Sequence, residues 1–138
     1  MAEKMCIGLF SGSIDRLTAA GVIISGAAAD DMDVDVYVLL QGARAFVKGN
    51  ENKIDTLSEN TQLKEEFMAS LDRLNVSTWL EFFKMAKEMT NVKVHICSLA
   101  GKIWGADKME DYIDIVDDII GIGEYIDAAK DADVHFFI

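Results

Sequence analysis

The chain reads VKVHICSLAGKIWG over residues 92–105, where a strand-like run passes directly into a predicted helix. Short apolar runs that end at a change of pattern are typical of buried strands. The same change occurs near the start of the chain, where MCIGLF (residues 5–10) is followed by the turn residues SGS and then by an Ala- and Gly-rich helix expected over residues 14–29. This repeated succession of strand and helix decides the fold class.

The rest of the chain continues the alternation. Strands are predicted at 5–10, 34–40, 92–97, within 113–117, and at 133–138. Helices are predicted at 14–29, 43–47, 63–71, 79–89, 99–105, 109–112 and 121–130. Buried strands joined by helical crossovers indicate an α/β protein, a three-layer α/β/α sandwich with a mainly parallel five-stranded sheet. The length predicts a single domain over residues 1–138, with a polar insertion near 48–62.

Composition narrows the classes of function and location. The net charge of −11 argues against nucleic-acid binding, which needs a basic face. No segment approaches the ~20 apolar residues of a membrane span, and no secretory signal is evident. Two cysteines do not make a disulfide framework. We therefore expect a cytoplasmic protein.

Ligand sites in parallel sheets form beyond the carboxyl ends of the strands. Three predicted strand ends carry polar or reactive side chains. They are Ser11, Gly12 and Ser13 after the first strand, Gln41 after the second, and Cys97 with Ser98 after the third. These six residues are the predicted site.

Cys97 has the most distinctive chemistry of the six. It stands at a strand end and a helix start, where free N–H groups and the helix dipole favour a thiolate, and Lys102 on the following helix adds positive potential. The alternative is that Cys97 is a small buried hydrophobe. Cys6 is expected in the core. A Cys6–Cys97 disulfide is not expected, since ~13 Å of strand rise separates the two positions.

Other motifs are weak. GIGEYI (residues 121–126) lacks the third glycine of a dinucleotide loop, and the chain has no P-loop sequence. Asp31, Asp33 and Asp35 alternate without the glycine and the glutamate of a calcium loop. No CxxC or HxxxH pattern supports zinc. We therefore predict neither a metal site nor a cofactor.

The sequence resembles the DsrE/DsrF-like family of sulfur-relay proteins. The similarity lies in the FSG-x-x-D start at Phe10, the GAAA-x-x-M-x-V stretch from Gly26, the strand-ending Cys97, and the closing DADV-apolar strand. The resemblance implies the sandwich fold, homo- or hetero-oligomers, and a role in carrying sulfane sulfur on the cysteine that corresponds to Cys97, as a persulfide or, in some branches, a thiosulfonate.

Three functions therefore stay open. The first is a sulfur carrier or sulfurtransferase, in which Cys97 exchanges sulfur with donor and acceptor proteins or small sulfane compounds. The second is a non-catalytic module that binds a small anion or a partner, with Cys97 only packed nearby. The weakest is peroxide reduction at Cys97. A homo-oligomer is also expected, partly because Trp79, Phe82 and Phe83 spread over a wide arc of one helix.

Overall fold

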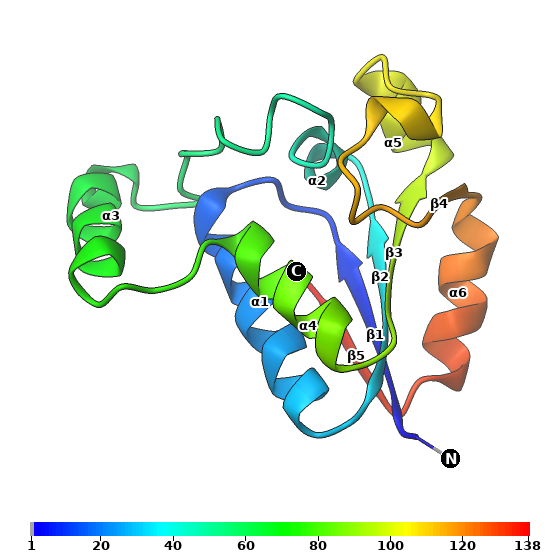
Figure 1. Ribbon diagram of the computed structural model, residues 1–138. Helices are drawn as coiled ribbons and strands as arrows, with labels where there is room; N and C mark the ends of the chain where they lie inside the picture. The colour runs from blue at the N-terminus through cyan, green and yellow to red at the C-terminus, as the bar shows by residue number, and fades with distance from the viewer. Residues whose placement is uncertain (1) are drawn as a thin grey trace.

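One parallel sheet forms the centre of the computed structural model, which describes residues 2–138 (Figure 1). Its strands are β1 (Lys4–Leu9), β2 (Asp33–Val38), β3 (Val92–Cys97), β4 (Asp118–Ile120) and β5 (Val134–Phe137). The order across the sheet is β4-β3-β2-β1-β5, and every neighbouring pair is parallel. The predicted α/β sandwich with a five-stranded sheet is confirmed.

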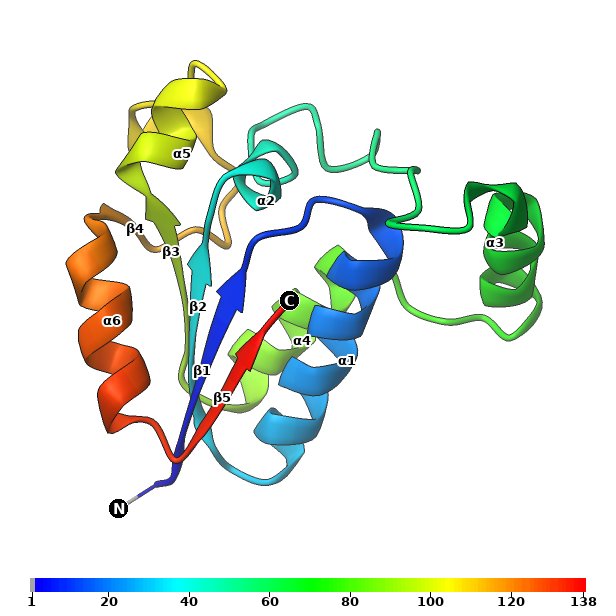
Figure 2. The ribbon, with the colours of Figure 1, turned by 180° about the vertical axis from the view of Figure 1, so that it is seen from behind.

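Helices cover both faces of this sheet. The main ones are α1 (Ile14–Ala29), α4 (Trp79–Met89) and α6 (Ile122–Asp131). Figures 1 and 2 show α1 and α4 on one face and α6 on the other. From β1 to β4 the strands follow one another in one direction across the sheet, and the chain then returns to β5 at the far edge. Because strand crossovers are right-handed, this reversal places α6 on the opposite face.

The other helical elements lie mostly at the carboxyl edge or beyond it. They are α2 (Gln41–Arg44), η1 (Thr61–Leu63), α3 (Lys64–Arg73), α5 (Ser98–Ile103) and η2 (Met109–Asp111). Helix α3 stands away from the sheet layers in both views, and it has no buried residue (Figures 1 and 2). No helix of residues 2–138 is both long enough and apolar enough to cross a membrane.

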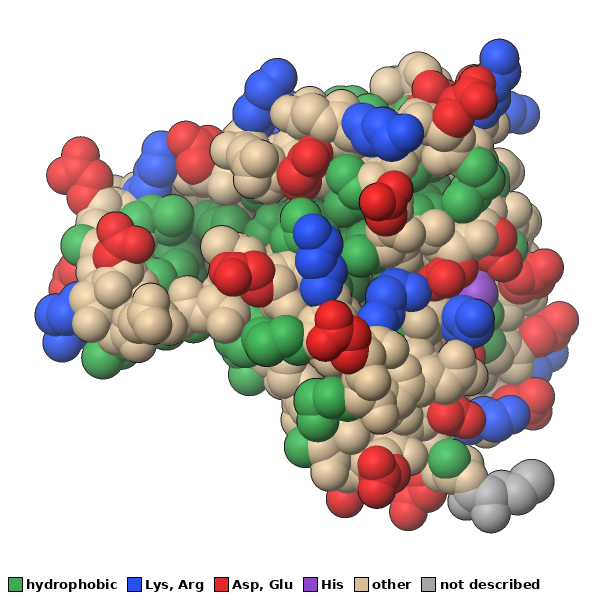
Figure 3. All heavy atoms as spheres, viewed as in Figure 1, with side chains coloured by type: hydrophobic (Ala, Val, Ile, Leu, Met, Phe, Trp, Pro, Cys, Tyr) green, Lys and Arg blue, Asp and Glu red, His purple; other side chains and the backbone are tan. Residues whose placement is uncertain are grey.

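The main core lies between the sheet and the pair α1 and α4. Alternate strand residues point into it, among them Ile7, Val36 and Ile96, and all three are fully buried. A smaller cluster on the α6 face contains Cys6, Tyr37 and Tyr125. Acidic side chains are spread over the surface seen in Figure 3 and do not gather over one element. The negative charge of the chain is therefore distributed on that face.

Helix α4 begins at Trp79, the residue at which the sequence predicts its start. Thr78 Oγ1 accepts the Glu81 N–H, and the Glu81 carboxylate accepts the Thr78 N–H, at 3.2 and 2.8 Å. This capping box satisfies two backbone donors that the helix itself leaves free.

The aromatic residues of α4 all pack within the chain. Trp79 and Phe83 are buried edge-on against Phe46, with ring centroids 5.1 and 5.8 Å away. Phe82 packs on α1, where a Cβ added to Gly21 would lie 2.8 Å from its own Cβ. The wide apolar arc of α4 is thus not evidence for a partner subunit, and the homo-oligomer stays an untested prediction.

The fourth strand was predicted within 113–117 but lies at Asp118–Ile120. The apolar residues Ile115 and Val116 do not belong to the strand. They are buried in the connection that precedes it. Asp117 then fixes where pairing begins: its N–H donates to the Val94 carbonyl at 2.8 Å, and its carboxylate accepts the Val94 N–H and the Lys87 ammonium. Strand pairing starts one residue later, at His95 and Asp118.

Candidate functional site

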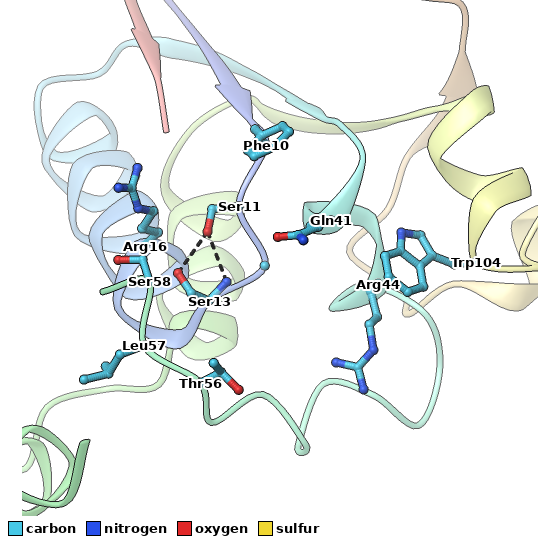
Figure 4. A pocket seen from close by; sticks show the side chains of 11 residues that line it. Phe10, Ser11, Ser13, Arg16, Gln41, Arg44, Thr56, Leu57, Ser58 and Trp104 are labelled. Carbon is cyan, nitrogen blue, oxygen red and sulfur yellow. Dashed lines mark hydrogen bonds between the residues drawn. The ribbon is translucent and has the colours of Figure 1, made fainter. Parts of the chain in front are cut away.

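A cavity of about 490 Å³ lies at the carboxyl edge of the sheet (Figure 4). Its walls come from the loop after β1, from α2 after β2, from the segment 56–58, and from the end of α5. The lining residues are Phe10, Ser11, Gly12, Ser13, Arg16, Gln41, Arg44, Thr56, Leu57, Ser58 and Trp104. Chain segments far apart in sequence thus meet at the edge where ligands of parallel sheets bind.

Two glycines allow the loops after β1 and β2 to approach each other. A Cβ on Gly12 would lie 2.6 Å from the carbonyl oxygen of Gln41, and one on Gly42 would lie 2.6 Å from that of Leu9. The Gly42 N–H also donates to the Phe10 carbonyl at 2.8 Å. The two loops are therefore in backbone contact, which only glycine permits at these positions.

We expect Gly12→Ala to destabilise the protein by about 1–3 kcal/mol, because the added methyl group collides with backbone that cannot easily move. Chemical denaturation measures the change. The matched control is Gly26→Ala in α1, where no heavy atom lies within 4 Å of the added Cβ. That control should be neutral or stabilising by about 0.5–1 kcal/mol, because alanine favours a helix over glycine. Equal stability of both variants would contradict the close contact.

The loop after β1 offers two hydroxyl groups to the cavity. Ser11 Oγ and Ser13 Oγ lie 2.9 Å apart, and Ser11 Oγ also accepts the Ser13 N–H at 3.2 Å. Ser13 precedes α1, but its side chain makes no capping hydrogen bond to the helix backbone. The two serines therefore order the loop and keep polar oxygen atoms at the cavity wall.

The segment 56–58 is tied down across the start of α1. The Ile14 N–H donates to the Thr56 carbonyl at 2.9 Å, and the Asp15 carboxylate accepts the N–H and hydroxyl of Ser58 at 3.0 and 2.6 Å. Leu57 between them is buried. Partial burial alone would raise the pKa of Asp15, but hydrogen bonds from Ser58 and Ser13 hold it below its usual range. Asp15 is therefore engaged as a carboxylate and is not among the residues that line this cavity.

The positive charge of the cavity comes from two arginines. Arg16 projects from the first turn of α1 and Arg44 from α2, on opposite sides in Figure 4. Both are exposed, and neither forms an ion pair with an acidic residue within residues 2–138. Among the described residues, no aspartate or glutamate lines the cavity. The charged side chains that line the cavity, among the described residues, are thus the two arginines.

The structure brings together four of the six predicted site residues. Ser11, Gly12, Ser13 and Gln41 line the cavity, whereas Cys97 and Ser98 do not. The expectation that Cys97 shares a pocket with residues 11–13 is not met by this cavity. Sequence reasoning missed Arg16, Arg44, Trp104 and the segment 56–58. Arg16 and Arg44 had a signal, because each lies three residues after a predicted site residue, Ser13 or Gln41, whereas Trp104 and the segment 56–58 reach the cavity through long-range packing.

Cys97 ends β3 and precedes α5, as predicted. Its exposed fraction is 9%, and it packs with the main core. Both cysteines are free. Cys6 is buried, and burial together with the Asp35 charge raises the pKa of its thiol to about 11. Cys6 is therefore a poor nucleophile at neutral pH.

A second polar cluster lies on the face of the sheet that α6 covers. The buried His95 ring bonds Asp118 through Nδ1 at 2.6 Å and Asp35 through Nε2 at 2.7 Å. It also stacks on Tyr37, with centroids 4.5 Å apart. A ring that donates to two carboxylates must carry both protons. Burial alone would lower the pKa of His95, but these hydrogen bonds raise it above its usual value.

The cluster predicts a dependence of stability on pH. Because folding raises the pKa of His95, its contribution is fully present below the unfolded value of about 6.5 and is lost as the pH rises through the folded value. The free energy of unfolding, measured from pH 5.5 to 9 for the wild type and for His95→Gln, isolates this contribution. The difference between the two proteins should shrink as the pH rises. A difference that stays constant or grows would show that the ring is neutral in the folded state.

No protein-family model matches the chain, and no curated protein matches it. The resemblance to the DsrE/DsrF-like family therefore stays a prediction. Within residues 2–138, no group of three or more histidine, cysteine, aspartate or glutamate side chains is placed to hold a metal ion.

Proposed function

We propose that the protein binds a small anionic ligand in the cavity at the carboxyl edge of its sheet. One observation carries this proposal. The net charge is −11, yet two of the three arginines of the chain line one cavity, unpaired, where no described residue contributes a carboxylate. The planar guanidinium group suits bidentate recognition of carboxylate and phosphate groups.

The neutral groups around the arginines favour the same ligand. The hydroxyl groups of Ser11 and Ser13 and the amide of Gln41 can donate hydrogen bonds to anionic oxygens. The N-terminus of α1, a helix of 16 residues, adds a positive partial charge at the same edge. Hydrogen-bond donors and positive charge thus line the same cavity from α1, from α2 and from the loop after β1.

Isothermal titration calorimetry with inorganic phosphate tests the proposal. The ionic strength is kept constant with chloride throughout the titration. A change in the screening of surface charges is then not mistaken for phosphate binding. We expect saturable binding of one phosphate per chain. Heat that follows ionic strength alone, without saturation, would count against a specific site.

Sulfur transfer through Cys97 is a second candidate. Cys97 lies at the carboxyl end of β3, at the sheet edge where the cavity opens, and its exposed fraction of 9% is not zero. In this mechanism a Cys97 thiolate attacks the outer sulfur of a persulfide donor, the S–S bond of the donor breaks, and the donor leaves as a thiolate. Cys97 then carries that sulfur as a persulfide until an acceptor thiolate attacks it and releases the Cys97 thiolate. The donors and acceptors would be proteins or small sulfane compounds of the reducing cytoplasm.

Intact-mass analysis after incubation with polysulfide tests this candidate. We expect the mass of one sulfur atom to be added at Cys97, and no addition in Cys97→Ser. Cys6→Ser is the matched control and should load like the wild type, because the raised pKa of Cys6 keeps its thiol protonated. Loading at Cys6 alone, or no loading at all, would remove the carrier function.

A further inference from the structure

The anion cavity is larger and more apolar than an inorganic ion requires. Its volume of about 490 Å³ lies within the range of about 300–1,000 Å³ that is typical of sites for small organic molecules. Besides its two arginines it is lined by Phe10, Leu57 and Trp104. A ligand that satisfied only the arginines would leave these apolar walls in contact with water.

Trp104 presents an aromatic ring whose orientation is fixed. It ends α5, and its indole Nε1–H donates to the Leu40 carbonyl at 2.8 Å. This bond ties the ring to the short connection between β2 and α2, directly before Gln41. Even so, 38% of the residue stays exposed. A ring that is held in place yet open at the cavity is prepared for stacking, since little side-chain freedom remains to be lost on binding.

Phe10 contributes a second aromatic wall from the loop after β1. It is 40% exposed, and its ring lies 6.3 Å from that of Phe137. Figure 4 shows Phe10 and Trp104 at separate places on the cavity wall, with the Arg44 side chain beside Trp104. On the α2 and α5 side, the cavity wall thus carries both an aromatic ring and an arginine side chain.

From these observations we propose that the ligand is an organic anion that carries an aromatic or heteroaromatic ring, with the ring on Trp104 and the anionic group at the arginines. This inference rests on the proposed anion site and defines the class of its ligand. A phosphate or carboxylate joined to a planar ring, up to the size of a mononucleotide, combines the two features. The step is binding only, and no bond of the ligand is made or broken.

Calorimetry with two matched pairs of probes tests the inference on the wild-type protein. AMP is compared with ribose 5-phosphate, and phenyl phosphate with inorganic phosphate. We expect the ring-bearing member of each pair to bind about tenfold more tightly, as aromatic stacking on a protein ring commonly gives. In Trp104→Leu this ratio should fall toward one, whereas Trp79→Phe, a change in the buried core, should preserve it.

Fluorescence gives an independent measurement. The chain has only two tryptophans, so in Trp79→Phe all tryptophan emission comes from Trp104. Ring-bearing probes should quench that emission, and ringless probes should not. Equal affinities within each pair would overturn the ring inference and leave the anion site standing. A ratio that Trp104→Leu does not change would remove Trp104 as the stacking surface, and failure of all four probes to bind would overturn the anion site itself.

Discussion

Loss of both cavity arginines, in Arg16→Gln/Arg44→Gln, should weaken phosphate binding by at least about 100-fold. A hydrogen bond to a charged group contributes about 1.5–3 kcal/mol, and the double variant removes the charged donors from both sides of the cavity. Glutamine keeps a polar side chain of similar reach but no charge. Because both arginines are exposed and unpaired, the free energy of unfolding should change little.

The third arginine is a matched control for this experiment. Arg73 lies in the last turn of α3, is exposed, and does not line the cavity. Arg73→Gln changes the net charge by the same amount as either single cavity substitution. It therefore measures the effect of long-range electrostatics alone. Similar losses of affinity in Arg73→Gln and in the single cavity variants would show that binding follows overall charge and not the cavity.

Phe83→Ala should lower the free energy of unfolding by about 3–5 kcal/mol, the usual cost of removing a buried aromatic ring. Phe83 is fully buried, and its ring lies edge-on to Phe46 at 5.8 Å and to Trp79 at 5.6 Å. This aromatic group holds α4 against the rest of the main core, so its loss leaves a cavity that the neighbouring rings cannot fill. Urea denaturation followed by circular dichroism measures the change.

Phe137→Ala is the comparison for this variant. Phe137 lies in β5, and 61% of it is exposed. Its truncation should cost less than about 1 kcal/mol, as is usual for exposed positions. A cost for Phe83→Ala as small as that for Phe137→Ala would mean that the α4 aromatics do not carry the packing described above.

The elements that could be predicted are those with strong local signals. The strand at 92–97 and the helix at 14–29 have the bounds that the sequence indicates, because apolar runs and turn residues mark both ends. The fourth strand could not be placed in this way. Ile115 and Val116 are as apolar and as buried as strand residues, but they lie in the connection before β4. Their sequence alone does not reveal this difference.

The candidate site likewise contains some residues that the sequence predicts and others that it does not. The cavity position could be predicted, since parallel strands bring Ser11, Gly12, Ser13 and Gln41 to one sheet edge. Trp104 could not, because it reaches the cavity only through its hydrogen bond to the Leu40 carbonyl, 64 residues away in sequence. The segment 56–58 lies in a polar stretch without periodicity, and its role depends on the contact between Asp15 and Ser58.

Titration of the isotope-labelled protein with inorganic phosphate, followed by amide chemical shifts in NMR spectra, tests the central claim most directly. The chain has a mass of 15.2 kDa, which is small enough for NMR to observe the amide signals of every described segment. The account predicts shifts concentrated at residues 11–16 and 41–44, with the indole N–H of Trp104 among them and with one saturation curve for all. Shifts centred on lysines far from the cavity, with residues 11–16 and 41–44 unchanged, would contradict it.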